Sequence, residues 1–206
     1  MKKRDGYHHG DLRAALVAES RRTVEQDGAD GLSLRAVARA VGVDIAAAYR
    51  HFRKKDDVLA TVAAAGFEEL GRAMAARMSE VAAAGGSSRD RFVACGTAYV
   101  AYGRAHPNLY RLMFGGRCSP EAIRRARGGP PAADAYDLLG EALAHLIDEG
   151  VLPRSARDGA ELVAWAQVHG LVSLAIDGRG GLARDADIEA RIERHIRVIV
   201  RGLSAA

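Results

Sequence analysis

The sequence predicts an all-α fold, and three observations lead to this prediction. Apolar residues recur three and four positions apart along most of the chain, which is the spacing of one helix face. Alternation of apolar and polar residues with a period of two, the sign of a half-buried strand, is absent. Clusters of Gly and Pro separate segments of helical length. A chain of 206 residues is long enough for one or two domains with buried cores.

Positive charge is concentrated near the N-terminus. Residues 1–55 hold 12 Lys and Arg against 7 Asp and Glu, whereas the remainder holds 18 against 19. A basic first part on a near-neutral remainder fits a polyanionic partner for that part alone. The chain has neither a long apolar run nor the apolar region of a signal peptide, so we expect a cytoplasmic protein. The two cysteines form neither a disulfide framework nor a zinc pattern.

The first helix is predicted from Asp11 to about Gln26, with Gly28 ending it and Asp30-Gly31 forming a turn. Before it, residues 1–9 form a basic segment with two readings. It is either a solvated tail or an arm that touches phosphate or the minor groove.

The stretch 33–55 predicts two short helices. Apolar residues at 34, 37, 38 and 41 form one stripe, and Ser33 stands where a hydroxyl caps a helix. Gly42 interrupts the stripe, and Asp44 offers a second cap for a helix that runs to Phe52. Two helices of this size, joined by a short turn with a Gly, predict a helix-turn-helix over about 33–52.

The second of these helices has two different faces. Ala48 and Phe52 share the side that would dock on the first helix. Small and polar residues surround the other side: Ala46, Ala47, Tyr49, Arg50 and His51, followed by Arg53, Lys54 and Lys55. Small residues allow close approach to a major groove, Arg donates to bases, and the cations suit phosphates. The alternative is an ordinary helical hairpin with a solvated basic face.

The residues Gly42-Val43, Tyr49-Arg50-His51-Phe52 and Lys55 resemble the signature of the TetR (tetracycline repressor) family of bacterial transcription regulators. The similarity extends from Gly10-Asp11-Leu12-Arg13 to about Leu70. It implies a DNA-binding domain at 10–70 and a C-terminal ligand-binding and dimerisation domain, which we place at 88–204. Trp165, His169 and Gly170 resemble a shorter signature of one class of such C-terminal domains, the Trp…His-Gly (WHG) class.

For DNA binding we expect Tyr49 and Lys55 to contact phosphates, and Arg50 with the alanines 46 and 47 to meet bases. The full candidate set is Ser33, Arg35, Asp44, Ala46, Ala47, Tyr49, Arg50, His51, Lys54 and Lys55. This surface has few polar side chains that could hydrogen-bond to base edges. We therefore expect the preference for a DNA sequence to depend on Arg50, on Arg35 and on DNA shape.

Beyond the helix-turn-helix the pattern predicts helices over about 56–78, 92–105, 133–148, 158–177 and 185–203, with a linker at 83–88 and a short apolar segment at 109–114. Aromatic residues and Met gather in this part. They are either core or the lining of a ligand pocket: Phe92, Tyr99, Tyr102, Leu109, Met113, Phe114, Trp165 and His169. His169 itself reads as either a hydrogen-bonded core residue or a ligand contact.

Two further clusters have functional readings. Arg124, Arg125 and Arg127 form either a solvated charge run or a second DNA contact. The apolar faces of the last two helices must be buried, and we expect pairing with the same helices of a second copy to bury them. The candidate dimer contacts are Val172, Ile176, Ile188, Ile192, Ile196 and Ile199.

The sequence therefore predicts a homodimeric repressor that binds a palindrome-like operator in double-stranded DNA and is released by a small, largely apolar ligand. An alternative keeps DNA binding but senses redox state through Cys95 or Cys118. Paired carboxylates, a Ser/His/Asp set, a phosphate loop and metal-ligand spacing do not occur in convincing form. We therefore expect no enzyme, no cofactor and no metal.

Overall fold

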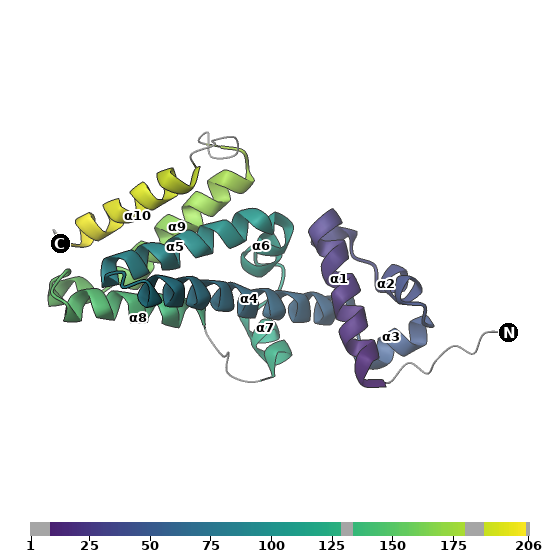
Figure 1. The fold of residues 1–206 in the computed structure, drawn as a ribbon. Coiled ribbons are helices and arrows are strands. Elements are labelled where there is room, and N and C mark those ends of the chain that lie inside the picture. Colours follow the sequence, from purple (N-terminus) through teal and green to yellow (C-terminus); the bar gives the residue numbers. More distant parts are fainter. Residues whose placement is uncertain (1–8, 129–133, 180–187, 205–206) are drawn as a thin grey trace. The chain divides into compact units, whose positions relative to one another are not determined.

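The computed structural model describes residues 9–128, 134–179 and 188–204, and all regular structure in these ranges is helical (Figure 1). The all-α prediction is confirmed. The elements, in chain order, are α1 (His9–Gly31), α2 (Leu34–Val41), α3 (Ile45–His51), α4 (Lys55–Ala83), α5 (Ser88–Ala105), α6 (Pro107–Phe114), α7 (Pro120–Arg127), α8 (Ala135–Asp148), the 3₁₀ helix η1 (Arg154–Arg157), α9 (Ala160–Ile176) and α10 (Ile188–Ser204).

These helices group into two compact units. Unit 1 holds α1, α2, α3, the start of α4 through Gly66, and α6 and α7. Unit 2 holds the rest of α4 together with α5, α8, η1, α9 and α10. The sequence-based division placed residues 106–130 in the C-terminal domain, whereas their packing groups them with the N-terminal helices. The reason is that α6 packs along α1.

The core of unit 1 forms between α1, α2, α3 and α6. Leu16 and Val24 of α1 are fully buried, as is Leu109 of α6. Gly66 lets α6 approach α4 closely, because a Cβ at this position would lie 2.7 Å from Met113 Sδ. Near the end of α1, Gly28 has φ 75° and ψ 175°, so the regular helix stops there as predicted and a further turn leads to Gly31.

The helix-turn-helix has the predicted caps and boundaries. Ser33 Oγ accepts a hydrogen bond from the Ala36 N–H at 3.4 Å, and Asp44 Oδ1 accepts one from the Ala46 N–H at 2.8 Å. Between the two helices, Gly42 adopts the left-handed conformation with φ 83°. These local interactions fix where α2 ends and where α3 begins.

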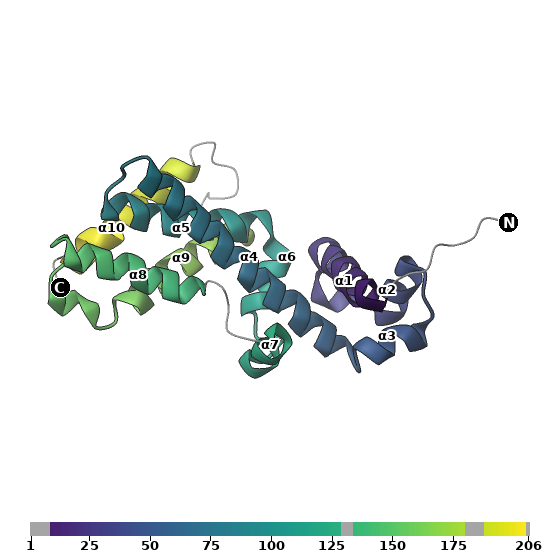
Figure 2. The same cartoon turned by 60° about the horizontal axis from the view of Figure 1, so that its bottom comes forward.

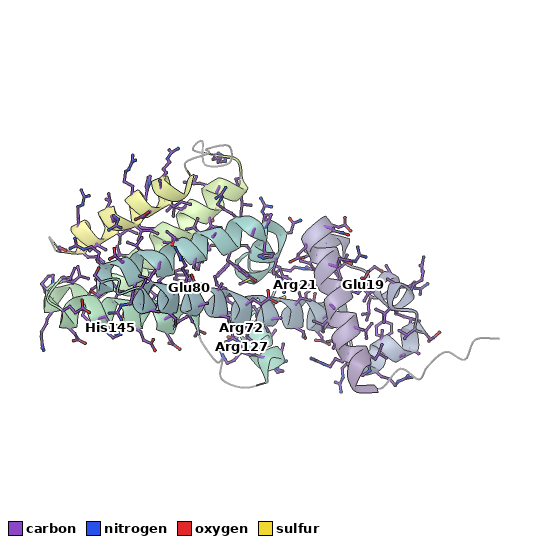
Figure 3. All side chains as sticks on the ribbon, viewed as in Figure 1. Glu19, Arg21, Arg72, Glu80, Arg127 and His145 are labelled. Carbon is purple, nitrogen blue, oxygen red and sulfur yellow. The ribbon has the colours of Figure 1, made fainter. Side chains whose placement is uncertain are left out.

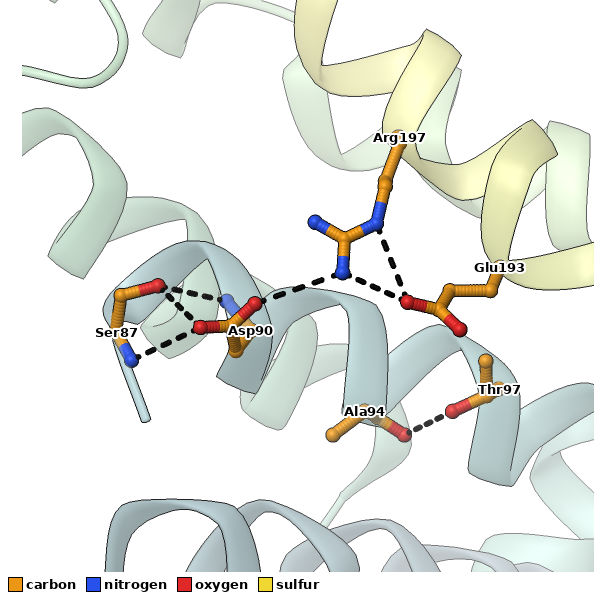
Figure 4. Close-up of polar contacts among 6 residues, drawn as sticks. All are labelled: Ser87, Asp90, Ala94, Thr97, Glu193 and Arg197. Atoms are coloured by element: carbon orange, nitrogen blue, oxygen red, sulfur yellow. Dashed lines mark hydrogen bonds and ion pairs between the residues drawn. The ribbon is translucent and has the colours of Figure 1, made fainter. Parts of the chain in front are cut away.

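In unit 2, α5 contacts α8, α9 and α10 (Figures 1 and 2). Its N-terminus is held by a reciprocal cap, in which Ser87 N–H donates to Asp90 Oδ2 at 3.2 Å and Asp90 N–H donates to Ser87 Oγ at 3.2 Å. The other oxygen of Asp90 lies 3.6 Å from Arg197 of α10, which also pairs with Glu193 (Figure 4). Further along, a Cβ on Gly96 would lie 2.7 Å from Ile196 Cδ1, so α5 and α10 approach closely.

The structure corrects the candidate dimer contacts. Four of them are buried inside one chain, so they are core positions of unit 2 and have no surface to offer a partner: Val172, Ile192, Ile196 and Ile199. Ile176 is half-buried, and the side chain of Ile188 lies outside the described residues. The large apolar side chains that α9 and α10 do expose are Leu162, Val163, Leu174 and Val198. The apolar stripe of α10 was predicted correctly, but much of it is covered by the same chain.

Candidate nucleic-acid interface

The α3 helix presents the face that its sequence predicts. Ala48 and Phe52 are buried against the rest of unit 1, and the Arg13 guanidinium lies 5.2 Å from the centre of the Phe52 ring. Ala46 and Arg50 are exposed, and 52% of the Tyr49 surface is accessible. A short, firmly docked helix therefore turns small residues, one Arg and one Tyr toward solvent.

The flanking cations lie at both ends of the helix-turn-helix. Arg35 is exposed in the first turn of α2, and Lys54 is exposed just before α4. Lys55 is half-buried, and its Nζ donates to the Asp30 carbonyl oxygen at 2.9 Å. An ammonium group has three protons, so this bond leaves donors for a phosphate while it ties the start of α4 to the turn before α2. His51 is half-buried at the end of α3.

Two of the candidate contacts have a structural task. Ser33 and Asp44 use side-chain oxygens to cap α2 and α3. The Ser33 hydroxyl keeps its proton for donation. The Asp44 carboxylate would repel phosphates, so its direct contact with DNA would be limited to a base amino group.

Sequence reasoning missed a polar node between α1 and α6. Glu25 Oε1 contacts both Arg21 Nε and His106 Nδ1, each at 3.1 Å, and Asn108 Nδ2 donates to the Glu25 carbonyl oxygen at 3.0 Å. Neither His106 nor Asn108 belongs to a recognisable motif, and a separation of about 80 residues hides such a pairing from local patterns.

Unit 2 contains a hydrogen-bonded aromatic cluster. Trp165 Nε1 donates to the Tyr99 hydroxyl oxygen at 3.2 Å, and the same oxygen lies 3.2 Å from His169 Nδ1. The Tyr99 hydroxyl either donates to His169 Nδ1 or accepts from it, according to the His169 tautomer, and a neutral imidazole allows both arrangements. Burial lowers the pKa of His169, which favours this neutral form. The Tyr136 ring packs edge-on against Trp165 at 6.0 Å.

Two family profiles match this chain. "Bacterial regulatory proteins, tetR family" matches residues 16–62, and "Tetracyclin repressor-like, C-terminal domain" matches residues 92–199. The chain belongs to the TetR family. It is a DNA-binding transcriptional regulator, as the helix-turn-helix predicted. Regulators of the TetR family bind DNA and dimerise, and they are generally not enzymes.

Solved structures similar to this TetR-family chain include a protein of unknown function from Rhodococcus sp. RHA1, with 32% identity and a TM-score of 0.80. The match covers 98% of this chain and 100% of the Rhodococcus chain. The TetR family transcriptional regulator PfmR from Thermus thermophilus has 19% identity and a TM-score of 0.64, with 91% and 98% covered. A tetR-family regulatory protein from Rhodococcus RHA1 has 16% identity and a TM-score of 0.65, with 98% and 100% covered. No curated protein matches significantly.

The pocket candidates of this TetR-family regulator divide between the two units. Phe92, Tyr99, Tyr102, Trp165 and His169 belong to unit 2, and the first three of these are buried. Leu109, Met113 and Phe114 belong to unit 1, where Leu109 and Met113 are core residues beside Gly66. The Tyr99–Trp165–His169 cluster is therefore the part of the candidate set that the structure brings together by hydrogen bonds.

Neither cysteine of this regulator favours the redox alternative. Both are buried, and burial raises the pKa of the Cys95 thiol to about 12. The pKa of Cys118 is also raised, first by burial and then by the negative charge of Asp56. A raised pKa leaves less of the reactive thiolate at neutral pH.

Two other kinds of feature, a metal centre and a membrane span, have no counterpart in the described ranges. No three His, Cys, Asp or Glu side chains there are grouped as a metal site would need. No helix in these ranges combines the length and apolar character of a membrane span.

Proposed function

We propose that this TetR-family regulator is a homodimeric repressor, which binds a palindrome-like operator through α3 of each protomer and is released by a small ligand. The observation that carries the proposal is the exposed face of α3, held in place by buried Ala48 and Phe52. One such helix contacts few base pairs, so two copies related by a two-fold axis supply the specificity.

The candidate side chains divide into two roles. Arg50 is placed to donate to a base edge, with guanine O6 and N7 as its best acceptors, and Ala46 and Ala47 suit thymine methyl groups. Arg35, Tyr49, Lys54 and Lys55 suit phosphates, with Ser33 and His51 beside them. Since Arg50 is the only long polar reader on this face of α3, DNA shape should contribute to the sequence preference.

The support for dimerisation comes from α9. Among its 17 residues only Glu161 is charged, yet one side of the helix is open in a single chain. Leu162 is 60% exposed and Leu174 is 44% exposed, and a Cβ on Gly170 would meet nothing within 4 Å. A helix that is apolar on all sides is stable when all sides are covered, and a second copy would cover this one.

The proposed ligand is small and largely apolar, and it binds in unit 2 near the Tyr99–Trp165–His169 cluster. A few polar groups among apolar residues such as Phe92 are typical of small-molecule sites. Release from DNA requires that the ligand bind one conformation of the dimer more tightly than the operator-bound one. A repressor of this kind works in the cytoplasm, where its DNA is.

The first experiment selects bound duplexes from a random pool of DNA. The expected result is a motif with two-fold symmetry, bound with nanomolar affinity. Tyr49→Ala and Arg50→Ala should each weaken binding to that motif by about 10-fold, equivalent to about 1.4 kcal/mol. Arg154→Ala removes an exposed arginine of unit 2 and serves as the control. Selection of no motif, or wild-type affinity in both α3 variants, would sink the proposal.

The second experiment uses the selected operator as the readout for a compound screen. A compound that releases the wild-type protein from DNA should also raise its melting temperature, because it binds the folded state. Phe92→Ala, which shortens a buried apolar side chain two turns before Tyr99 on α5, should require a higher concentration of that compound. Release with an unchanged dose response in this variant would place the ligand elsewhere.

A further inference from the structure

The segment that contains α6 and α7 brings strong positive charge into the unit that holds the helix-turn-helix. Residues 107–128 carry five arginines and one acidic residue, Glu121. Sequence reasoning treated Arg124, Arg125 and Arg127 as part of the C-terminal domain, where a solvated charge run was one of two readings. Their packing in unit 1 changes the weight of the two readings, because they share a unit with the DNA-reading helix.

The side of α7 that faces solvent is basic. Ile123 and Cys118 are buried and anchor the segment, whereas Arg124 and Arg125 are exposed. Within the described residues, neither of these two arginines forms a side-chain hydrogen bond or an ion pair within 4 Å. Arg127, labelled in Figure 3, is half-buried and is not part of the exposed pair.

The one acidic neighbour does not neutralise this pair. The pKa of Glu121 is lowered mainly by hydrogen bonds from its own backbone N–H and from Ser119, and to a smaller extent by the charges of Arg124 and Arg125. Glu121 lies in the first turn of α7, where negative charge is favourable. One carboxylate against two guanidinium groups leaves the exposed side of α7 with a net positive charge.

An ion pair fixes the start of this segment beside the start of α4. Arg117 lies 3.6 Å from Asp56, which directly follows Lys54 and Lys55. Asp57 accepts a hydrogen bond from the Lys54 N–H at 3.2 Å and so caps α4. Asp56 is thus paired with Arg117 and Asp57 caps α4, while Arg53 and Lys54 remain exposed beside them.

We propose that α7 is a second DNA-contact surface, in which Arg124 and Arg125 bind phosphates that flank the base pairs read by α3. The proposal rests on the proposed operator binding and adds to it. Duplex DNA fits this surface because guanidinium groups bind phosphate oxygens in a bidentate manner. Such contacts add affinity without sequence preference and weaken as salt concentration rises.

The test compares two duplexes with the same operator, one trimmed to the operator and one extended by about ten base pairs on each side, roughly one helical turn. Affinity is measured by fluorescence anisotropy over a series of salt concentrations. The double variant Arg124→Gln/Arg125→Gln should bind the long duplex about 10-fold more weakly. Its slope of log K against log salt should fall by about 0.9 for each phosphate that the variant no longer neutralises. On the trimmed duplex the variant should bind like the wild type.

Two controls make the outcome specific. Arg89→Gln/Arg154→Gln removes the same charge from exposed positions of unit 2 and should leave both duplexes unaffected. Arg124→Lys/Arg125→Lys keeps the charge and should restore most of the salt slope. Because Arg124 and Arg125 are exposed, the melting temperature of both α7 variants should stay that of the wild type.

A wild-type salt slope for the Gln variant on the long duplex would overturn the proposal. So would an equal loss on both duplexes, or an equal loss in the unit 2 control, since either result would reflect overall charge. Failure of operator binding itself is recognised separately. In that case Tyr49→Ala would bind both duplexes like the wild type, whereas failure of the α7 proposal leaves the Tyr49 effect intact.

Discussion

The α3 and α9 helices both leave one side open in a single chain, and the two open sides differ in a way that separates their partners. The exposed positions of α3 include Ala46, Tyr49 and Arg50. Those of α9 include Leu162, Val163 and Leu174. α3 carries Tyr49, Arg50 and His51 among its seven residues, whereas Glu161 is the one charged residue of α9.

The size of the exposed side chains makes the difference. Alanine keeps the helix backbone close to whatever it meets, which suits a groove lined with polar base edges. Leucine and valine fill space and gain free energy only against another apolar surface, at about 25 cal/mol per Å² buried. We therefore expect a larger side chain on the exposed side of α3 to weaken operator binding. A charged side chain on the exposed side of α9 should instead disrupt the dimer.

The largest effect is expected from Leu174→Arg. A charge within the proposed α9 interface should convert the dimer to a monomer and weaken operator binding by about 100-fold or more, because each helix-turn-helix then binds alone. Analytical ultracentrifugation and anisotropy measure the two effects. The monomer should stay folded, since Leu174 is exposed in one chain. Ala76→Arg on α4 is the control, and a Leu174→Arg dimer would contradict the comparison.

The opposite change, added bulk on α3, comes next. Ala46→Leu should weaken operator binding by about 10-fold or more, since the larger side chain holds α3 away from the groove. Dimerisation and melting temperature should not change, because Ala46 is exposed. Ala101→Leu, at an exposed position of α5, gives the matched control. Tight operator binding by Ala46→Leu would mean that α3 does not enter the groove closely.

The inner side of α9 allows a third prediction. Tyr99→Phe removes the hydroxyl that joins Trp165 and His169, so each of these loses one hydrogen-bond partner. The free energy of unfolding should fall by about 1–2 kcal/mol, measured by urea denaturation. Tyr102→Phe removes a hydroxyl whose bond to Glu69 is 3.3 Å long, and it should cost less. A wild-type free energy of unfolding in Tyr99→Phe would show that the cluster does not stabilise unit 2.

The smallest effect concerns the cap of α5. The pKa of Asp90 is lowered, chiefly by hydrogen bonds from Ser87. Asp90→Asn should therefore cost about 0.5–1 kcal/mol at neutral pH. Because the folded-state pKa lies below the usual value of 3.8, this difference is present above that value and disappears as pH falls through the folded-state pKa. Denaturation at several pH values measures it, with Asp148→Asn as the control, and a difference that persists in acid would contradict the assignment.

Local chemistry made the helix-turn-helix predictable from sequence. Ser33, Gly42 and Asp44 act on residues within four positions of themselves, and the burial of Ala48 and Phe52 follows from helical spacing. The same reasoning located most of the later helices. Where an element is determined by interactions between residues close in the chain, its position can be predicted from the sequence.

The faces of the last helices could not be assigned in this way. Apolar spacing shows that Ile192, Ile196 and Ile199 are covered, but it does not show by what, and the answer includes α5 of the same chain through Gly96. The membership of α6 in unit 1 depends on contacts such as Glu25 with His106, which are 81 residues apart. Nothing local to either residue records that pairing.

The packing of α6 along α1 determines where this regulator can be divided into fragments that fold. The chain passes between the units three times, after Gly66, after Ala105 and between α7 and α8. A fragment that stops at Gly66 would keep the helix-turn-helix but lose the side chains of Leu109, Leu112 and Met113, which are buried in the intact chain. The helix-turn-helix is thus not an independent folding unit. A fusion of this region to another ligand-binding domain would have to include residues 106–128.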